Sequence, residues 1–258
     1  MIAWFEGSDL MTITDPVELE TLKAIGRIVA QTLESMKAAV RPGMTTLELD
    51  ELGLRLLREA GAVAAPPSVY GFPGATCISI SPVAAHGIPN GRVIQPGDIV
   101  NIDVSASLDG IFADNGGSVA IPPVSPGTER LLSTAREALD AAVAAARAGR
   151  PVNNIGRAAE KVAHRAGYRI VKALTSHGVG HTLHDDPGSV FNFYRPSERR
   201  LLQAGWVLAI EPFLTSGSGD IFEEEDRWTL RTSDHKPVAQ FEHTVVVTEG
   251  EPLIVTKI

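Results

Sequence analysis

Two segments of this chain that lie far apart in the sequence are variants of one another. Residues 41–61, RPGMTTLELDELGLRLLREAG, align without a gap with residues 147–167, RAGRPVNNIGRAAEKVAHRAG. Both begin with Arg-x-Gly, continue with the apolar spacing of a helix and end in Ala-Gly. The tetrapeptide HGIP at 86–89 likewise matches HGVG at 177–180. The repeat predicts a fold built from a duplicated half-unit.

A further correspondence between the halves concerns carboxylates. The run GDIVNID at 97–103 matches GWVLAIE at 205–211, so that Asp103 corresponds to Glu211. Each apolar run therefore ends in an acid at the equivalent position. We expect a site between the two halves, to which both contribute similar chemical groups.

The order of secondary structure along the chain is helices, strands, helices, strands. Asp15 before a proline predicts a helix start, and Thr45 with Glu48 predicts a capping box. Helices are expected over 16–40 and 45–61, strands over 62–121, two helices over 128–167, and mainly strands over 168–258. No linker rich in Pro, Ser or Gly separates the halves. We therefore expect a single domain over residues 14–258, preceded by an N-terminal extension over 1–13.

Composition excludes several classes of partner. The chain of 258 residues has a net charge of −8 and a pI near 5.4, which argues against nucleic acid and anionic membranes as partners. Cys77 is the single cysteine, so no internal disulfide can form, which fits a reducing compartment. No apolar run reaches the length of about 20 residues that a membrane span needs. We expect a cytoplasmic, monomeric protein that binds neither nucleic acid nor membrane.

Residues 100–117, VNIDVSASLDGIFADNGG, predict a hairpin, because an Asp-Gly pair separates two alternating runs. If Leu108 pairs with Ile111, the side chains of Asp103 and Asp114 point to the same side. Their Cα atoms would lie roughly 7–8 Å apart, the usual diagonal spacing. Taken alone, the simpler interpretation is a solvent-facing hairpin with two harmless aspartates. If the face is buried, a metal ion would resolve the repulsion between the carboxylates.

The second half repeats this arrangement and favours the metal. Glu211 ends an apolar run, and Glu242 lies inside VAQFEHTVVVT, a strand too apolar to bury a carboxylate that is neither paired nor bound. Four acids with one histidine are typical ligands of two divalent ions such as Mn²⁺, Fe²⁺ or Co²⁺, and Zn²⁺ is also compatible. Two such ions, about 3.5–4 Å apart, can share a bridging water and lower its pKa.

Three of the seven histidines lie in TSHGVGHTLHDDP, residues 175–187. His177 is either a hydrogen-bonded loop histidine or a metal ligand, and the four acids favour the ligand. His181 is expected at the surface or at the rim of the site. Cys77 is expected to be a small apolar residue and not a nucleophile, since no histidine is evidently paired with it. The remaining histidines outside HGIP are expected to be solvated or structural: His164, His235 and His243.

The motifs HGIP, NIDV…DG…AD, HGVGHTLHDDP, AIEP and QFEHTVVVT occur in this order. Together they closely resemble the methionine aminopeptidases, and the resemblance runs from about Thr14 to Thr256. It implies an α+β "pita-bread" (creatinase/aminopeptidase) fold. In that fold two helix pairs cover a curved antiparallel sheet with pseudo-twofold symmetry. The repeat described above is what such a fold predicts, and the compact chain is similar to bacterial type I members.

The resemblance also implies roles for individual residues. The metal ligands would be Asp103, Asp114, His177, Glu211 and Glu242, with Asp114 and Glu242 bridging two ions. The catalytic residues would be His86, which contacts the scissile amide nitrogen, His184, which hydrogen-bonds the substrate carbonyl and its oxyanion, and Glu211, which shuttles protons. The substrate would be bound by these two histidines and by a methionine pocket of Phe72, Cys77 and Trp228.

The activity implied is removal of the initiator methionine from nascent peptides with a small second residue, by a hydroxide that bridges two divalent ions. The expected partner is the N-terminus of a nascent peptide, at the ribosome or free of it. Ala85, Asn115 and Leu183 depart from the usual pattern and could reshape the methionine pocket. Two alternatives stay open: an aminopeptidase of the same fold that cleaves before proline, and a non-catalytic binding scaffold.

Overall fold

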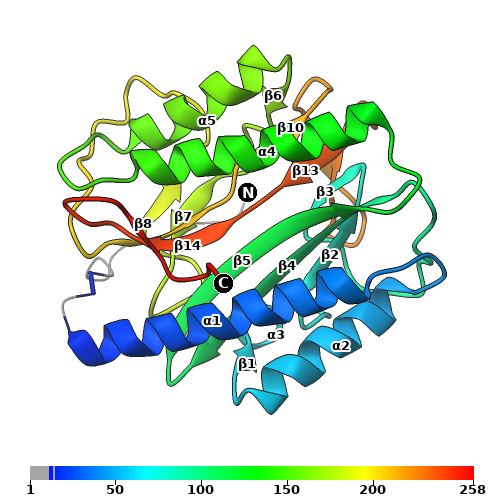
Figure 1. Cartoon of the computed structure of the whole chain (residues 1–258), viewed down its shortest axis with the longest axis horizontal. Helices are drawn as coiled ribbons and strands as arrows, with labels where there is room; N and C mark the ends of the chain where they lie inside the picture. The colour runs from blue at the N-terminus through cyan, green and yellow to red at the C-terminus, as the bar shows by residue number, and fades with distance from the viewer. Residues whose placement is uncertain (1–11, 14) are drawn as a thin grey trace.

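The computed structural model describes residues 12–13 and 15–258, and in it two pairs of long helices flank a set of antiparallel strands (Figure 1). Apart from Thr12 and Ile13, the extension expected over 1–13 lies outside the described residues. Thr12 pairs with Trp206 in an isolated bridge, and Ile13 is buried in the hydrophobic core of the first half. No helix in the described part of the chain is long and apolar enough to cross a membrane.

The helices begin where local chemistry predicts. They are α1 (Pro16–Ala39), α2 (Thr46–Glu59), α3 (Ala65–Tyr70), α4 (Pro126–Ala145) and α5 (Asn153–Arg165). The Asp15 side chain accepts a hydrogen bond from the backbone N–H of Val17, and the capping box of Thr45 and Glu48 is confirmed. Helix α4 begins two residues before the expected position, because Ser125 supplies the N-cap and a proline follows it.

Helix α3 was not expected, since it lies in the region assigned to strands. Its first turn contains Pro66 and Pro67, where the missing backbone N–H groups cost nothing. Gly71 then ends the helix in the left-handed conformation with φ 68°. This short helix has a functional consequence, because it carries Tyr70 toward the site described below.

All pairings between the named strands are antiparallel. The first half contains β1 (Val63–Ala64), β2 (Cys77–Ile80), β3 (Val83–Ala85), β4 (Ile99–Leu108) and β5 (Ile111–Ala120). The second half contains β6 (Arg169–Ile170), β7 (Ser176–Gly178), β8 (Asp185–Val190), β9 (Val207–Ile210), β10 (Phe213–Thr215), β11 (Ile221–Glu223), β12 (Leu230–Thr232), β13 (Val238–Gln240), β14 (His243–Val246) and β15 (Leu253–Ile254). The two main sheets have the orders β1-β4-β2, with β5 beside β4, and β15-β14-β9-β7-β8. The predicted hairpin register is confirmed, because Leu108 pairs with Ile111.

Each helix pair covers the strands of its own half. Helix α1 runs along β4 and β5, and α4 runs along β13 and β14 (Figure 1). One core cluster joins α1 and α2 to β4, through residues such as Leu22, Leu49 and Ile102. A second cluster joins α4 and α5 to β9 and β14. The halves meet where the backbone N–H of Glu242 donates to the carbonyl of Gly116 (2.9 Å), which brings carboxylates of both halves together.

Candidate metal centre

Strands β4 and β5 supply the first pair of acids. Ser105 pairs with Asp114 and Asp103 pairs with Gly116, so the two aspartates are diagonal neighbours on one face, as the hairpin predicted. Their carboxyl groups are close enough to shift each other's pKa. Burial raises the pKa of Asp103 to about 6. Burial, and then the charges of Glu242 and Asp103, raise the pKa of Asp114 well above its ordinary value. Two carboxyl groups this close and this enclosed cannot both ionise without a nearby positive charge.

The second half adds Glu211 and Glu242. Glu211 directly follows β9, and Glu242 lies between β13 and β14. Burial is the largest cause of a raised pKa for both, and the charge of Asp103 raises both further. Glu242 also accepts a hydrogen bond from Gln240, and the nearby Gln240 side chain acts in the opposite direction on the pKa of both glutamates. The four acids therefore form one electrostatically linked group drawn from both halves.

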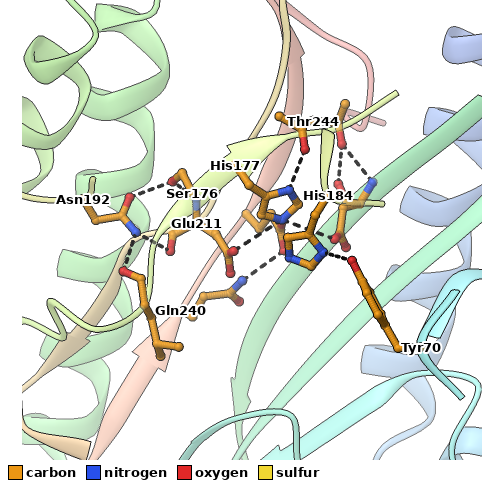
Figure 2. Close-up of polar contacts among 12 residues, drawn as sticks. Tyr70, Ser176, His177, His184, Asn192, Glu211, Gln240 and Thr244 are labelled. Carbon is orange, nitrogen blue, oxygen red and sulfur yellow. Dashed lines mark hydrogen bonds and ion pairs between the residues drawn. The ribbon is translucent and has the colours of Figure 1, made fainter. Parts of the chain in front are cut away.

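His177, at the middle of β7, faces these acids (Figure 2). Its Nδ1 lies 2.8 Å from the carbonyl oxygen of Gly178. A carbonyl only accepts, so Nδ1 carries the hydrogen and Nε2 presents its lone pair. Nε2 lies 3.6 Å from Oε1 of Glu211 and 3.9 Å from Oδ2 of Asp114. Burial lowers the pKa of His177 to about 4, which keeps the ring neutral, the form that binds metals.

Unsatisfied oxygens show that the group fits a cation. Asp114 Oδ1 and Glu242 Oε1 are buried and have no hydrogen-bond partner in the part of the chain that the structure describes. Asp114, His177 and Glu242 each offer a ligand atom within 4.8 Å of the others. Leaving a buried polar atom unpaired costs about 1–3 kcal/mol, and more for a charged group. An oxygen-rich set with one neutral imidazole suits hard or borderline divalent ions, so the residues present fit the metal that the sequence predicted.

Residues that the sequence analysis missed hold this group in place. Gln240 Nε2 donates to Oε2 of Glu242 (3.1 Å), while Oε1 of Gln240 accepts from Asn101 Nδ2 (2.8 Å). Gly116 leaves room for both glutamine and glutamate, since an added Cβ would lie 2.6 Å from Gln240 Nε2 and 2.9 Å from Glu242 Oε2. Gln240 lies two residues before Glu242, and this strand spacing was a signal that could have found it.

Glu211 is held through its backbone. Its N–H donates to Ser176 Oγ (2.9 Å), and its carbonyl accepts from Asn192 Nδ2 (3.2 Å). Ser176 in turn donates to Asn192 Oδ1 (2.7 Å). Both of these supporting side chains are fully buried. Nothing in the sequence pattern indicated Asn192, because its contacts join segments that are distant along the chain.

His184 lies beside His177, with ring centroids 4.1 Å apart, and Figure 2 shows the two rings converging with Glu211. Burial, followed by the charges of His177 and His86, lowers the pKa of His184 to about 2. His86 adopts the left-handed conformation with φ 54° directly after β3 and is an exposed residue, although desolvation of its imidazole lowers its pKa. His181 is also exposed and lies 3.3 Å from a carboxylate oxygen of Glu18, as expected for a rim residue.

The three predicted pocket residues fall into two groups. Phe72 is buried and makes an edge-to-face contact with Trp228, with centroids 5.2 Å apart. Cys77 on β2 pairs in register with Asp103 on β4, next to the acids. Burial and then the charge of Asp103 raise the pKa of the Cys77 thiol, so it stays protonated. A protonated thiol behaves as a small apolar group and not as a nucleophile.

The acidic stretch at 223–226 does not contribute to this centre. The carboxylate of Asp226 accepts from the backbone N–H groups of Trp228 and Thr229 (both 2.8 Å) and so shapes the turn that carries Trp228. Glu224 pairs with Arg231. The three residues that depart from the usual pattern are buried: Ala85, Asn115 and Leu183.

The chain matches known proteins over nearly its whole length. The model of metallopeptidase family M24 matches residues 20–249. Methionine aminopeptidase 2 of Bacillus subtilis (strain 168) is 43% identical over 249 residues, which are 96% of this chain and 100% of that protein. The structure of methionine aminopeptidase from Thermotoga maritima has a TM-score of 0.93 at 30% identity, covering 96% of this chain and 100% of that one. The prolidase from Pyrococcus furiosus shares the fold, with a TM-score of 0.78 at 20% identity, and the match covers 66% of its length. The fold expected from the sequence is confirmed.

Proposed function

The chain belongs to metallopeptidase family M24, and on this premise we propose that it removes the N-terminal methionine from peptides whose second residue is small. The observation that carries the proposal is the buried group of Asp114, His177 and Glu242, which has unsatisfied carboxylate oxygens and an imidazole lone pair turned toward them. Such a group needs a cation, and it lies in a chain similar over 96% of its length to methionine aminopeptidases.

We assign two divalent ions, Co²⁺, Mn²⁺ or Fe²⁺, to a set of five ligands: Asp103, Asp114, His177, Glu211 and Glu242. Bound divalent ions lower the pKa of water and polarise a carbonyl oxygen, which supplies the nucleophile and the electrophilic pull for peptide hydrolysis. Among the described residues, Asp114 and Glu242 each have an unsatisfied buried oxygen, so each would offer a further ligand atom to the ions, as the bridging role implied by the resemblance would need.

The chain's own groups carry out proton transfer and charge stabilisation. Glu211 accepts the proton of the attacking water and returns it to the leaving amine, and the backbone contacts with Ser176 and Asn192 fix its position for this task. His184 donates a hydrogen bond to the carbonyl oxygen as negative charge develops on it. His86 contacts the scissile amide nitrogen from the exposed side of the site.

We assign the specificity for methionine to the apolar residues near this centre. Phe72, Trp228 and Cys77 form an apolar surface for the methionine side chain, in keeping with the preference of thioethers for aromatic edges and apolar groups. We place the protein in the cytoplasm as a monomer with a single catalytic domain over 14–258, acting on nascent peptides.

A matrix of peptides and metals tests the function. Enzyme loaded in turn with Mn²⁺, Fe²⁺, Co²⁺ or Zn²⁺ is mixed with Met-Ala-Ser, Met-Leu-Ser and an Ala-Pro peptide, and release of the first residue is measured. We expect cleavage of Met-Ala-Ser alone, loss of activity on chelation and recovery when metal is returned. Equal turnover of both methionine peptides would refute the specificity, and preferred cleavage before proline would assign another reaction. Protein that retains no divalent metal at micromolar supply would instead be a binding scaffold.

A further inference from the structure

Tyr70, the last residue of α3, reaches from the first half of the molecule to His184 in the second half. Its hydroxyl lies 2.5 Å from Nδ1 of His184, and the two rings meet edge to face with centroids 5.5 Å apart (Figure 2). In the described residues, the hydroxyl makes no other hydrogen bond with protein. The contact is fixed from both sides, because Gly71 stops the helix at this residue and the tyrosine ring packs on the imidazole.

The partner of Nδ1 differs between the two neighbouring histidines. In His177 the partner is the carbonyl of Gly178, which only accepts, so the hydrogen lies on Nδ1 and Nε2 has the lone pair. In His184 the partner is a hydroxyl, which can donate. If Tyr70 donates, Nδ1 of His184 has the lone pair and the ring hydrogen lies on Nε2. The two stacked rings would then be opposite tautomers.

Two observations indicate that Tyr70 is the donor. If Nδ1–H of His184 were the donor, the O–H of Tyr70 would have no protein partner among the described residues, because its hydroxyl makes only this hydrogen bond there. Burial, and then the charge of Asp114, raise the pKa of Tyr70 to about 12, so the hydroxyl has a proton to donate at neutral pH.

We propose that Tyr70 is a positioning residue that donates to Nδ1 of His184 and so holds the neutral ring with its hydrogen on Nε2. This rests on the proposed function, in which His184 must donate a hydrogen bond to the substrate oxygen. Tyr70 determines which nitrogen of His184 carries the hydrogen, as the third member of a hydrolase triad does for its histidine.

The tautomer can be measured without metal or substrate. The ring nitrogens of ¹⁵N-histidine-labelled, metal-free protein are observed by NMR at pH 8, where an ordinary histidine is neutral. The signals of His184 are those missing from His184→Gln. We expect hydrogen on Nε2 in the native protein and a mixture of tautomers in Tyr70→Phe, which keeps the ring and loses the hydroxyl. Tyr194→Phe is the matched control, since Tyr194 is similarly exposed (37% against 41%) and stacks on Arg157, and its spectrum should not change.

Kinetics of the metal-loaded enzyme give the second measurement. For Met-Ala-Ser we expect Tyr70→Phe to lower kcat about fivefold, the equivalent of about 1 kcal/mol, with KM within about twofold. Hydrogen on Nδ1 of His184 in the native protein, or identical tautomers in Tyr70→Phe, would overturn the proposal even if the enzyme is active. Conversely, a tyrosine-dependent tautomer in a protein that cleaves no methionine peptide would uphold the proposal and overturn the proposed function.

Discussion

Gly116 offers a precise perturbation of the metal centre, because it is the point at which β5 touches the glutamate of the other half. It lies opposite Asp103, and its carbonyl accepts from the backbone N–H of Glu242. A Cβ at Gly116 would lie 2.6 Å from Gln240 Nε2 and 2.9 Å from Glu242 Oε2, closer than real Cβ contacts allow. Its φ is not in the left-handed region, so alanine meets a clash and no backbone strain.

The size of the effect follows from which atoms must move. Overpacking a well-packed interior costs about 1–3 kcal/mol. The carboxylate of Glu242 and the amide of Gln240 can relieve the clash only by turning, which breaks the hydrogen bond that orients the ligand. Loss of such an orienting contact costs about 10–100-fold in metal affinity. We therefore expect Gly116→Ala to bind Mn²⁺ at least about tenfold more weakly.

Gly117 provides the matched control. It is the next residue of β5, and a Cβ there would lie 3.4 Å from its nearest neighbour, a carbon of the Phe241 ring. Gly117→Ala should keep native metal affinity and native or slightly raised stability, since glycine in a strand costs about 0.5–1 kcal/mol relative to alanine. Titration calorimetry with Mn²⁺ on chelator-treated protein compares the variants. Equal affinities for the two would refute the idea that Gly116 makes room for the ligand.

Two further perturbations test the charges. Asp114→Asn should lower Mn²⁺ affinity and activity more than tenfold. It should not destabilise the metal-free protein, because it removes the repulsion between Asp114 and Glu242. A lower free energy of unfolding of the metal-free variant in urea would contradict this. His243 hydrogen-bonds to Thr256, and burial lowers its pKa in the folded protein to about 4 from 6.5. The neutral ring therefore stabilises the fold fully above pH 6.5, and this contribution declines as the pH falls toward 4. Between pH 7.5 and 5.5 the free energy of unfolding of the native protein should therefore fall by about 1 kcal/mol more than that of His243→Gln. Equal falls in the two proteins would show that the ring has an ordinary pKa in the folded protein.

The acids of the centre could be located from sequence because local rules fix them. An Asp-Gly turn sets the register of one hairpin, and the two-residue period of a strand then places Asp103 and Asp114 on one face. Burial converts this placement into chemistry, since carboxylates in apolar strands require a partner. Glu242 followed from the same reasoning, and the structure buries it with an unsatisfied oxygen.

The supporting residues could not be found in this way, because their partners are distant in sequence. The side chain of Asn192, which follows β8, donates to the backbone carbonyl of Glu211, which follows β9. Gln240 is oriented by the side chain of Asn101 from the other half. Tyr70 lies on a helix that two adjacent prolines made hard to predict, since proline patterns resemble turns more than helix starts. Each of these residues depends on how the halves pack, which no local pattern encodes.

The duplication predicts where equivalent residues lie, yet their chemistry diverges for a structural reason. His86 and His177 are equivalent, and each is followed by a glycine whose added Cβ would clash with a neighbouring carbonyl, at 2.4 Å for Gly87 and 2.1 Å for Gly178. The close backbone approach is thus common to both halves. His177, however, lies within β7 with its Nδ1 hydrogen-bonded to a carbonyl of its own strand, whereas His86 follows β3 at φ 54° and is an exposed residue. The buried copy presents a fixed lone pair to the acids, and the exposed copy is free to meet a substrate. One difference in backbone conformation is therefore sufficient to assign the two equivalent histidines to different proposed tasks.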